Sequence, residues 1–400
     1  MTFRTIADLD VRGKRVLLRE DLNVPLRDGR VADETRIVAA LPTIRALRER
    51  GARVLILSHL GRPSGPDPAL SLRPIAGVLS ERLGIPVAFA EDCIGDAARA
   101  IAERLRDGEV ALLENVRFHA GEERNDPAFA QALAELGDCY VNDAFGTAHR
   151  AHASTEGIPR LLPSAAGLLM QAELAALSRL LDCPERPFVC VIGGAKVKDK
   201  VGVFVNLLAR VQAFCIGGGM ANTFLAAQGV NVGRSLRDDD LEPARRILQL
   251  ARDHGVVLHL PDDAVVSATF DDDAGAHTAE ITAIGDTMIL DIGPRTARRY
   301  AEVIEEARTI VFNGPMGVYE RAPYREGTRI VGEAIARATE RGAFSVVGGG
   351  DAAAAAQMLG FADRVTHLST GGGATLEYLE GKMLPGVAAL SVPAAPEGAA

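Results

Sequence analysis

Short apolar runs that alternate with helical stretches constrain the fold of this chain more than any other feature. They are rich in leucine and β-branched residues and fall at 15–18, 53–57, 110–113, 139–141, 188–192, 213–216, 256–260, 309–312 and 344–347. Near-continuous apolar strands separated by helices are typical of parallel sheets that are buried on both faces. The pattern therefore predicts an α/β fold with doubly wound, mostly parallel sheets flanked by helices.

The length of 400 residues exceeds what one hydrophobic core usually serves, so we expect two such domains. Leucine and alanine recur at helical spacing over 167–181, and the following Cys-Pro-Glu-Arg-Pro segment at 183–187 ends that pattern. We predict an N-terminal domain over 1–168, an interdomain hinge helix over 169–182 and a C-terminal domain over 183–387.

Composition limits the partners and the compartment. The chain is 48% apolar and carries a net charge of -9, which indicates a globular protein and argues against binding to nucleic acid or a membrane surface. Its five cysteines are scattered and never form a C-x-x-C pair, as expected of a reduced, cytoplasmic protein. No signal peptide or run of about 18 apolar residues is present, so we expect neither secretion nor a membrane span.

Polar and basic residues follow the apolar runs of the first half, at the sheet edge where α/β proteins bind ligands. Those that could bind phosphate, carboxylate and hydroxyl groups together are Asp21, Asn23, Arg36, His59, Arg62, Arg117 and Arg150. Any one of them alone is better read as part of a surface salt bridge. His149 and His152 lie three residues apart, but no third metal ligand has a suitable spacing, so core or capping roles are favoured.

Glycine-rich turns mark the second half. Gly-Gly-Ala-Lys at 193–196 could bring backbone amides and Lys196 to a phosphate, although it is no Walker A loop and a plain turn remains equally open. Triglycines at 348–350 and 371–373 each precede a helical stretch and could face a polyphosphate, with Asp351 placed to hold Mg²⁺. After the run at 309–312, Pro315 and Met316 could wall a base pocket and Glu320 could accept ribose hydroxyls.

Taken together and in this order, the segments resemble the bacterial type of phosphoglycerate kinase, from about residue 4 to about residue 390. The matching motifs are Arg-x-Asp-x-Asn-Val-Pro at 19–25, Ser-His-Leu-Gly-Arg-Pro at 58–63, Asn-Asp-Ala-Phe-Gly-Thr-Ala-His-Arg at 142–150, Gly-Gly-Ala-Lys-Val at 193–197, Asn-Gly-Pro-Met-Gly-Val at 313–318 and Ser-Thr-Gly-Gly-Gly-Ala at 369–374.

The resemblance implies reversible phosphoryl transfer from 1,3-bisphosphoglycerate to MgADP, giving 3-phosphoglycerate and MgATP, by direct in-line transfer after domain closure. The first domain would bind phosphoglycerate, and a tail from about 388 to 400 would return to it. Catalytic roles would fall on Arg36, Lys196, Gly372 and Gly373. Nucleotide and Mg²⁺ binding would involve Lys196, Lys200, Gly217, Gly218, Asn313, Pro315, Glu320, Gly348, Gly349, Gly350 and Asp351. The family is also expected to be monomeric.

The chain departs from the family pattern at Ala352, where a Thr or Ser hydroxyl near the phosphates is usual. Two other functions stay open from the residues alone. The chain could be a non-catalytic anion-binding protein on the same fold, or an enzyme that phosphorylates a different carboxylate. An intact Lys196, Asp351 and the five pocket arginines (Arg19, Arg36, Arg62, Arg117 and Arg150) speak against a degenerate copy.

Overall fold

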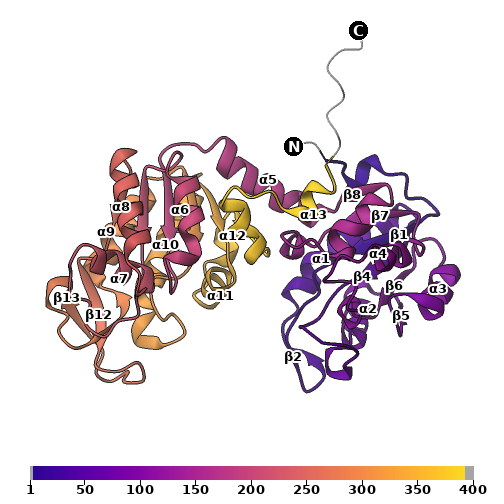
Figure 1. Ribbon diagram of the computed structural model, residues 1–400, viewed down its shortest axis with the longest axis horizontal. Helices are drawn as coiled ribbons and strands as arrows, with labels where there is room; N and C mark the ends of the chain where they lie inside the picture. The colour runs from indigo at the N-terminus through magenta and orange to yellow at the C-terminus, as the bar shows by residue number, and fades with distance from the viewer. Residues whose placement is uncertain (1–2, 392–400) are drawn as a thin grey trace, which may run out of the picture. The chain divides into compact units, whose positions relative to one another are not determined.

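The computed structural model describes residues 3–391 and separates into two compact units (Figure 1). The first unit runs from the N-terminus to Leu174 and takes up the chain again from Met383. The second unit comprises Ala175–Lys382. The division falls inside helix α5 (Leu168–Asp182), the segment for which the sequence predicts a connecting helix. Residues 392–400 of the expected tail lie outside the described residues.

The first unit is built on a six-stranded parallel sheet, ordered β5-β6-β4-β1-β7-β8. Its strands are β1 (Arg15–Arg19), β4 (Arg53–Leu57), β5 (Val87–Ala90), β6 (Val110–Leu113), β7 (Cys139–Asn142) and β8 (Ser164–Ala166). The hairpin strands are β2 (Leu26–Arg27) and β3 (Arg30–Val31), and the helices are α1 (Thr35–Glu49), α2 (Arg73–Leu83), α3 (Gly95–Arg104), α4 (Pro127–Ala134) and α13 (Pro385–Ala388). Central strands such as β6 are buried along their whole length, as the apolar runs require.

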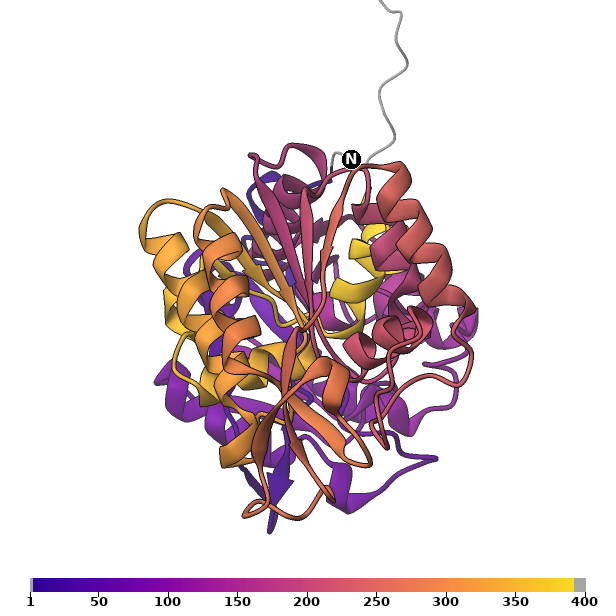
Figure 2. The ribbon, with the colours of Figure 1, turned by 90° about the vertical axis from the view of Figure 1, so that its left-hand side faces the viewer.

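The second unit has its own six-stranded parallel sheet, ordered β11-β10-β9-β15-β16-β17. Its strands are β9 (Phe188–Ile192), β10 (Ala213–Ile216), β11 (Val257–His259), β15 (Thr309–Asn313), β16 (Phe344–Val347) and β17 (His367–Leu368). Its helices are α6 (Val201–Leu207), α7 (Gly218–Ala227), α8 (Glu242–Asp253), α9 (Pro294–Glu305), α10 (Glu326–Glu340), α11 (Gly350–Met358) and α12 (Gly373–Leu379). Figure 2 shows this sheet between orange helices on one side and pink-to-red helices on the other. The predicted fold, two parallel sheets flanked by helices, is confirmed.

Both sheets reverse their strand order at the same place in the topology. In the first unit, β1 pairs with β4 on one side and with β7 on the other. In the second, β9 pairs with β10 and with β15. In each sheet, the chain therefore leaves neighbouring central strands, β1 and β7 or β9 and β15, toward opposite sides. In sheets of this kind such a reversal opens a crevice at the carboxyl edge, where ligands bind.

A small antiparallel sheet in the second unit lies outside the sequence prediction. It is ordered β13-β12-β14, with strands β12 (Asp263–Ser267), β13 (His277–Glu280) and β14 (Met288–Ile292). Val266 and Ala264 of β12 pack with Ile281 and Leu225 in a separate apolar cluster. The sheet supplies one wall of a cavity described below.

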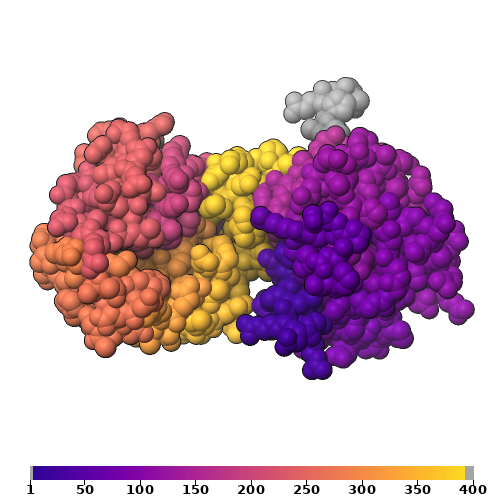
Figure 3. Space-filling model, turned by 60° about the horizontal axis from the view of Figure 1, so that its bottom comes forward, coloured from indigo at the N-terminus to yellow at the C-terminus, as the bar shows by residue number. Residues whose placement is uncertain are grey.

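The end of the described chain packs on the first unit. Leu384, Val387 and Leu390 are buried, and the amide of Gly386 donates a hydrogen bond to the carbonyl of Ala148 at 2.8 Å. A single antiparallel bridge joins Phe3 to Ser391. Figure 3 shows an early part of the chain, in indigo, on the surface of the same unit. Within residues 3–391, no helix is long and apolar enough to cross a membrane.

Candidate functional site

The loops after β1 and β4 and the first turn of α1 bring four predicted residues together in the first unit. Arg36, in the first turn of α1, forms an ion pair with Asp21 at 2.6 Å between Nη1 and Oδ2. The other carboxylate oxygen of Asp21 lies 4.0 Å from Nδ1 of His59. Asn23 accepts a hydrogen bond at 2.9 Å from the amide of Gly61, beside Arg62, so its side chain ties the two loops together. Arg62 itself is exposed.

A concentration of positive charge surrounds His59. This residue is buried, and its Nδ1 lies 3.1 Å from Nη2 of Arg19. Burial holds the pKa of His59 well below its ordinary value, and positive charges lower it further, those of Arg19, Arg117, Arg150 and Arg36. His59 is therefore neutral near pH 7, and the excess cationic charge around it is available to an anion.

The pKa of Arg117 is also lowered by its surroundings. Burial, and then the charge of Arg150, lowers the pKa of the Arg117 guanidinium to about 10. Its Nη1 donates to the carbonyl of Gly61 at 2.6 Å, and its Nε lies 3.2 Å from a carboxylate oxygen of the exposed Glu123. Arginines this close to one another repel, and a bound anion with several negative charges would relieve that repulsion.

Two acidic groups that the sequence analysis did not single out lie behind this pocket. Glu20 is fully buried, and neither of its carboxyl oxygens has a hydrogen-bond partner within residues 3–391. Burial and then the negative charge of Asp143 raise the pKa of Glu20 well above its ordinary value. Burial also raises the pKa of Asp143, to about 6. Both acids directly follow a strand, so their position at the sheet edge is the sequence feature that could have identified them as candidate site residues.

In the second unit, Lys200 bridges the point where the sheet reverses its order. Its ammonium donates to the carbonyl of Gly193, after β9, and to that of Asn313, at the end of β15, both at 2.7 Å. Burial lowers the pKa of Lys200 to about 8. The amide nitrogen of Asn313 in turn donates to the carbonyl of Gly348 at 2.7 Å, so the turns after three strands are connected.

A cavity of about 350 Å³ opens above these turns. The predicted residues that line it are Lys196, Lys200, Asn313, Asp351, the glycines at 348–350 and those at 372 and 373. Gly372 precedes α12, and Gly350 and Asp351 begin α11. Backbone amides at helix N-termini together with lysine side chains favour anions such as phosphate.

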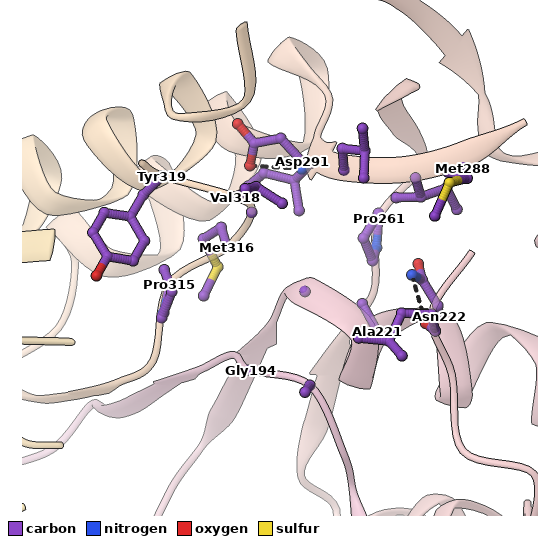
Figure 4. Close-up of a pocket in the computed structure, with 18 of the residues that line it drawn as sticks. Gly194, Ala221, Asn222, Pro261, Met288, Asp291, Pro315, Met316, Val318 and Tyr319 are labelled. Atoms are coloured by element: carbon purple, nitrogen blue, oxygen red, sulfur yellow. Dashed lines mark hydrogen bonds between the residues drawn. The ribbon is translucent and has the colours of Figure 1, made fainter. Parts of the chain in front are cut away.

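A second cavity, of about 290 Å³, adjoins the first and shares Gly194, Ala195 and Asp351 with it. Its lining is mostly apolar, and Figure 4 shows Pro315 and Met316 on one side of it. Gly218 and Glu320, both predicted, also line it. The sequence analysis missed several lining residues, namely Pro261, Met288, Asp291, Ala221 and Asn222.

Glycine is required where the chain segments of this cavity touch. Gly218 has a φ of 65°, and an added Cβ would lie 2.8 Å from the carbonyl oxygen of Gly194. Gly217 is buried, with the backbone of Met316 at 2.7 Å from the position of such a Cβ. These close approaches place the β9 turn, the start of α7 and the loop after β15 against one another.

The residues around Asp351 suit a hard cation. Asp351 is exposed in the first turn of α11 and lines both cavities, and Asp199 lines the larger one. Carboxylate oxygens beside a phosphate site are the ligands that Mg²⁺ uses. Ala352, which follows Asp351, is buried and contributes no hydroxyl. The donor set is thus compatible with Mg²⁺ bound mainly through phosphate and water.

Comparisons with known proteins identify the family and agree with the fold. A family model described as phosphoglycerate kinase matches residues 6–382. The phosphoglycerate kinases of Thermomicrobium roseum and Moorella thermoacetica are 56% and 54% identical to the chain, cover 97% of it, and are themselves covered over 99% and 98%. The structure of phosphoglycerate kinase from Coxiella burnetii superposes with a TM-score of 0.88 at 42% identity, over 97% of this chain and 99% of that one. The crystal structure of the Pyrococcus horikoshii OT3 enzyme gives 0.82 at 37% identity, over 97% and 98%.

Proposed function

Because the chain belongs to the phosphoglycerate kinase family, we propose that its two sites hold the two substrates of one phosphoryl transfer. The reaction is that of an ATP:3-phosphoglycerate 1-phosphotransferase, which in glycolysis transfers a phosphoryl group from 1,3-bisphosphoglycerate to ADP. The assignment of the two sites rests on a difference between the units in the side chains that they gather. One unit gathers arginines around a buried neutral histidine, and the other joins an apolar cavity to a glycine-lined one.

The arginine pocket of the first unit is the proposed phosphoglycerate site. Arg117 and Arg150 supply the charge for the phosphate group, and Arg62 extends from the neighbouring loop. Asp21 and Asn23 provide acceptors for the substrate hydroxyl, while neutral His59 can hydrogen-bond without adding charge.

The paired cavities of the second unit are the proposed nucleotide site. A base would lie against Pro315 and Met316, with Glu320 accepting ribose hydroxyls. The phosphates would enter the glycine-lined cavity beside Lys196 and Lys200. Asp351 would hold Mg²⁺, whose charge neutralises phosphate oxygens during transfer.

For the transfer itself, we propose that Arg36, Lys196 and the amides at Gly372 and Gly373 surround the transferring phosphoryl group. Such transfer requires positioning and neutralisation of charge on the equatorial oxygens rather than a covalent enzyme intermediate. Because the substrates bind different units, closure must bring the reacting atoms into line and exclude water, which would otherwise hydrolyse the acyl phosphate. Helix α5 is the proposed hinge. A cytoplasmic monomer without nucleic-acid or membrane partners remains part of this proposal.

A coupled assay with ATP, Mg²⁺ and 3-phosphoglycerate tests these roles. We expect Arg36→Ala and Lys196→Ala each to lower kcat by about 10²-fold or more, as loss of a cation at the transferring group does elsewhere. Arg27→Ala and Lys198→Ala are matched controls, because both residues are exposed and carry no proposed role. Full activity in folded Arg36→Ala would remove Arg36 from the mechanism. Faster turnover with another carboxylate acceptor than with 3-phosphoglycerate would instead identify that acceptor as the substrate.

A further inference from the structure

The carboxyl ends of β5 and β6 bring three potential metal ligands together. These strands are parallel neighbours, with Ala90 opposite Leu113, so the loops that leave them start side by side. Asp92 and Cys93 lie on the loop after β5, and His119 follows the short helical turn after β6. One carboxylate oxygen, one sulfur and one imidazole nitrogen all lie within 4.8 Å of one another.

The three side chains are held differently. Nε2 of His119 lies 2.6 Å from Oδ1 of Asp92, and both residues are partly exposed. The ring of His119 stacks on Phe129 of α4, with centroids 5.2 Å apart, which sets its orientation. Cys93 is fully buried, so its sulfur approaches from the protein interior while the other two ligands face the surface. The group is therefore open on one side only.

We propose that Asp92, Cys93 and His119 bind one divalent ion of the zinc type, with water completing a tetrahedral shell. Mixed sulfur, imidazole and carboxylate donors favour Zn²⁺ or Co²⁺ over Mg²⁺, which prefers oxygen. Zinc ligands are about 3.3–3.7 Å apart in a tetrahedral site, given bond lengths of about 2.0–2.3 Å. The partly exposed side chains of Asp92 and His119 can make the small inward movement that this requires.

Binding would replace the present contact between His119 and Asp92 and release the thiol proton of Cys93 to solvent, because the metal ligand is the thiolate. The ion would then join the loops after two adjacent strands. Its site would be separate from the Mg²⁺ site proposed at Asp351, which lies in the other unit and offers only oxygen donors.

Titration of the tag-free, full-length protein with Co²⁺ tests the site, because a cobalt–thiolate bond gives a charge-transfer absorption band in the near ultraviolet. We expect the band to saturate at one equivalent, to persist in excess Mg²⁺ and to disappear on addition of Zn²⁺. Cys93→Ser should abolish it, and His119→Gln should weaken Co²⁺ binding by at least about tenfold.

Cys183→Ser is the matched control, because Cys183 is the exposed cysteine of the chain and should not contribute to the band. Kinase activity and circular dichroism report whether each variant is folded. If Cys93→Ser fails to fold, the Co²⁺ affinity of His119→Gln still tests the proposal, because His119 is partly exposed. Absence of a band in the wild type, an unchanged affinity in folded His119→Gln, or loss of the band in Cys183→Ser would each overturn the proposal.

Discussion

Lys200 is a partly buried cation whose ammonium donates hydrogen bonds to two backbone carbonyls. Burial lowers its pKa to about 8, from an ordinary value of 10.5. Between these two values the unfolded chain holds a proton at this position that the folded chain has released. Folding stability must therefore rise with pH across this window, since the unfolded state binds more protons.

Lys200→Met provides the comparison, because it removes the titrating group and keeps the side chain about as long. Between pH 8 and 10 we expect the wild type to gain stability relative to this variant, by up to about 1.4 kcal/mol per pH unit. Denaturant unfolding at several pH values measures the difference, and other titrating groups cancel in it. A constant difference across this range would show that the pKa of Lys200 is not depressed.

Glu123 is the exposed carboxylate that offsets the charge of Arg117 in the proposed phosphoglycerate pocket. Glu123→Gln should therefore strengthen binding of 3-phosphoglycerate and lower its KM about two- to fivefold at low salt, within the range of exposed ion pairs. Added salt should reduce this gain. Glu135→Gln is a fitting control, because Glu135 is also exposed and lies 3.9 Å from an arginine outside the pocket. A raised KM in Glu123→Gln would contradict the electrostatic argument.

At the scale of secondary structure elements, helix α7 is flanked by two glycines, and the space around them differs. Gly218 at its start and Gly229 beyond its end both have positive φ, but an added Cβ is crowded only at Gly218, by the backbone of Gly194. Gly229→Ala should cost about 1–2 kcal/mol of stability, from backbone strain alone, and leave the KM for ATP unchanged. Gly218→Ala should also displace the β9 turn and raise that KM at least about tenfold. Equal KM values for the two variants in a steady-state assay would remove the close approach as a determinant of nucleotide binding.

The accuracy of sequence interpretation also differed between elements. The central strands β1, β4, β9 and β15 were predictable because continuous apolar runs leave few alternatives to a buried strand. The edge strands β5, β8 and β17 were missed. β8 and β17 are short and partly polar, whereas β5 is an apolar run of only four residues. The antiparallel strands β12–β14 were also missed, although β14 is mostly apolar, so the cavity wall that contains Met288 was not anticipated.

At the scale of the whole molecule, the described end of the chain belongs to the unit that contains its beginning. Leu390 is buried there, so Leu390→Ala should cost about 2–4 kcal/mol through lost contacts and a residual cavity. Hydrogen exchange should accelerate in β7 and its neighbours in the first unit, while β9 and β15 keep their protection. Met383→Ala, at an exposed position, serves as the control. Acceleration in both units would show that they unfold together.

The family and the two-sheet fold could be predicted from motifs that surround the strand ends, because those residues are adjacent in sequence. Contacts between distant segments could not. The distribution of charge around His59 depends on side chains from four separate segments of the chain, and no spacing in the sequence encodes their distances. The burial of the Glu20 carboxyl is likewise visible only once the chain is folded.

The return of residues 383–391 to the first unit has a consequence for how the protein is made. A ribosome synthesises the chain from its N-terminus, so the whole second unit is polymerised before the segment that contains Leu384, Val387 and Leu390. Until then, the surface around Ala148 that receives this segment is uncovered on the nascent chain. The unit synthesised first is therefore the one completed last.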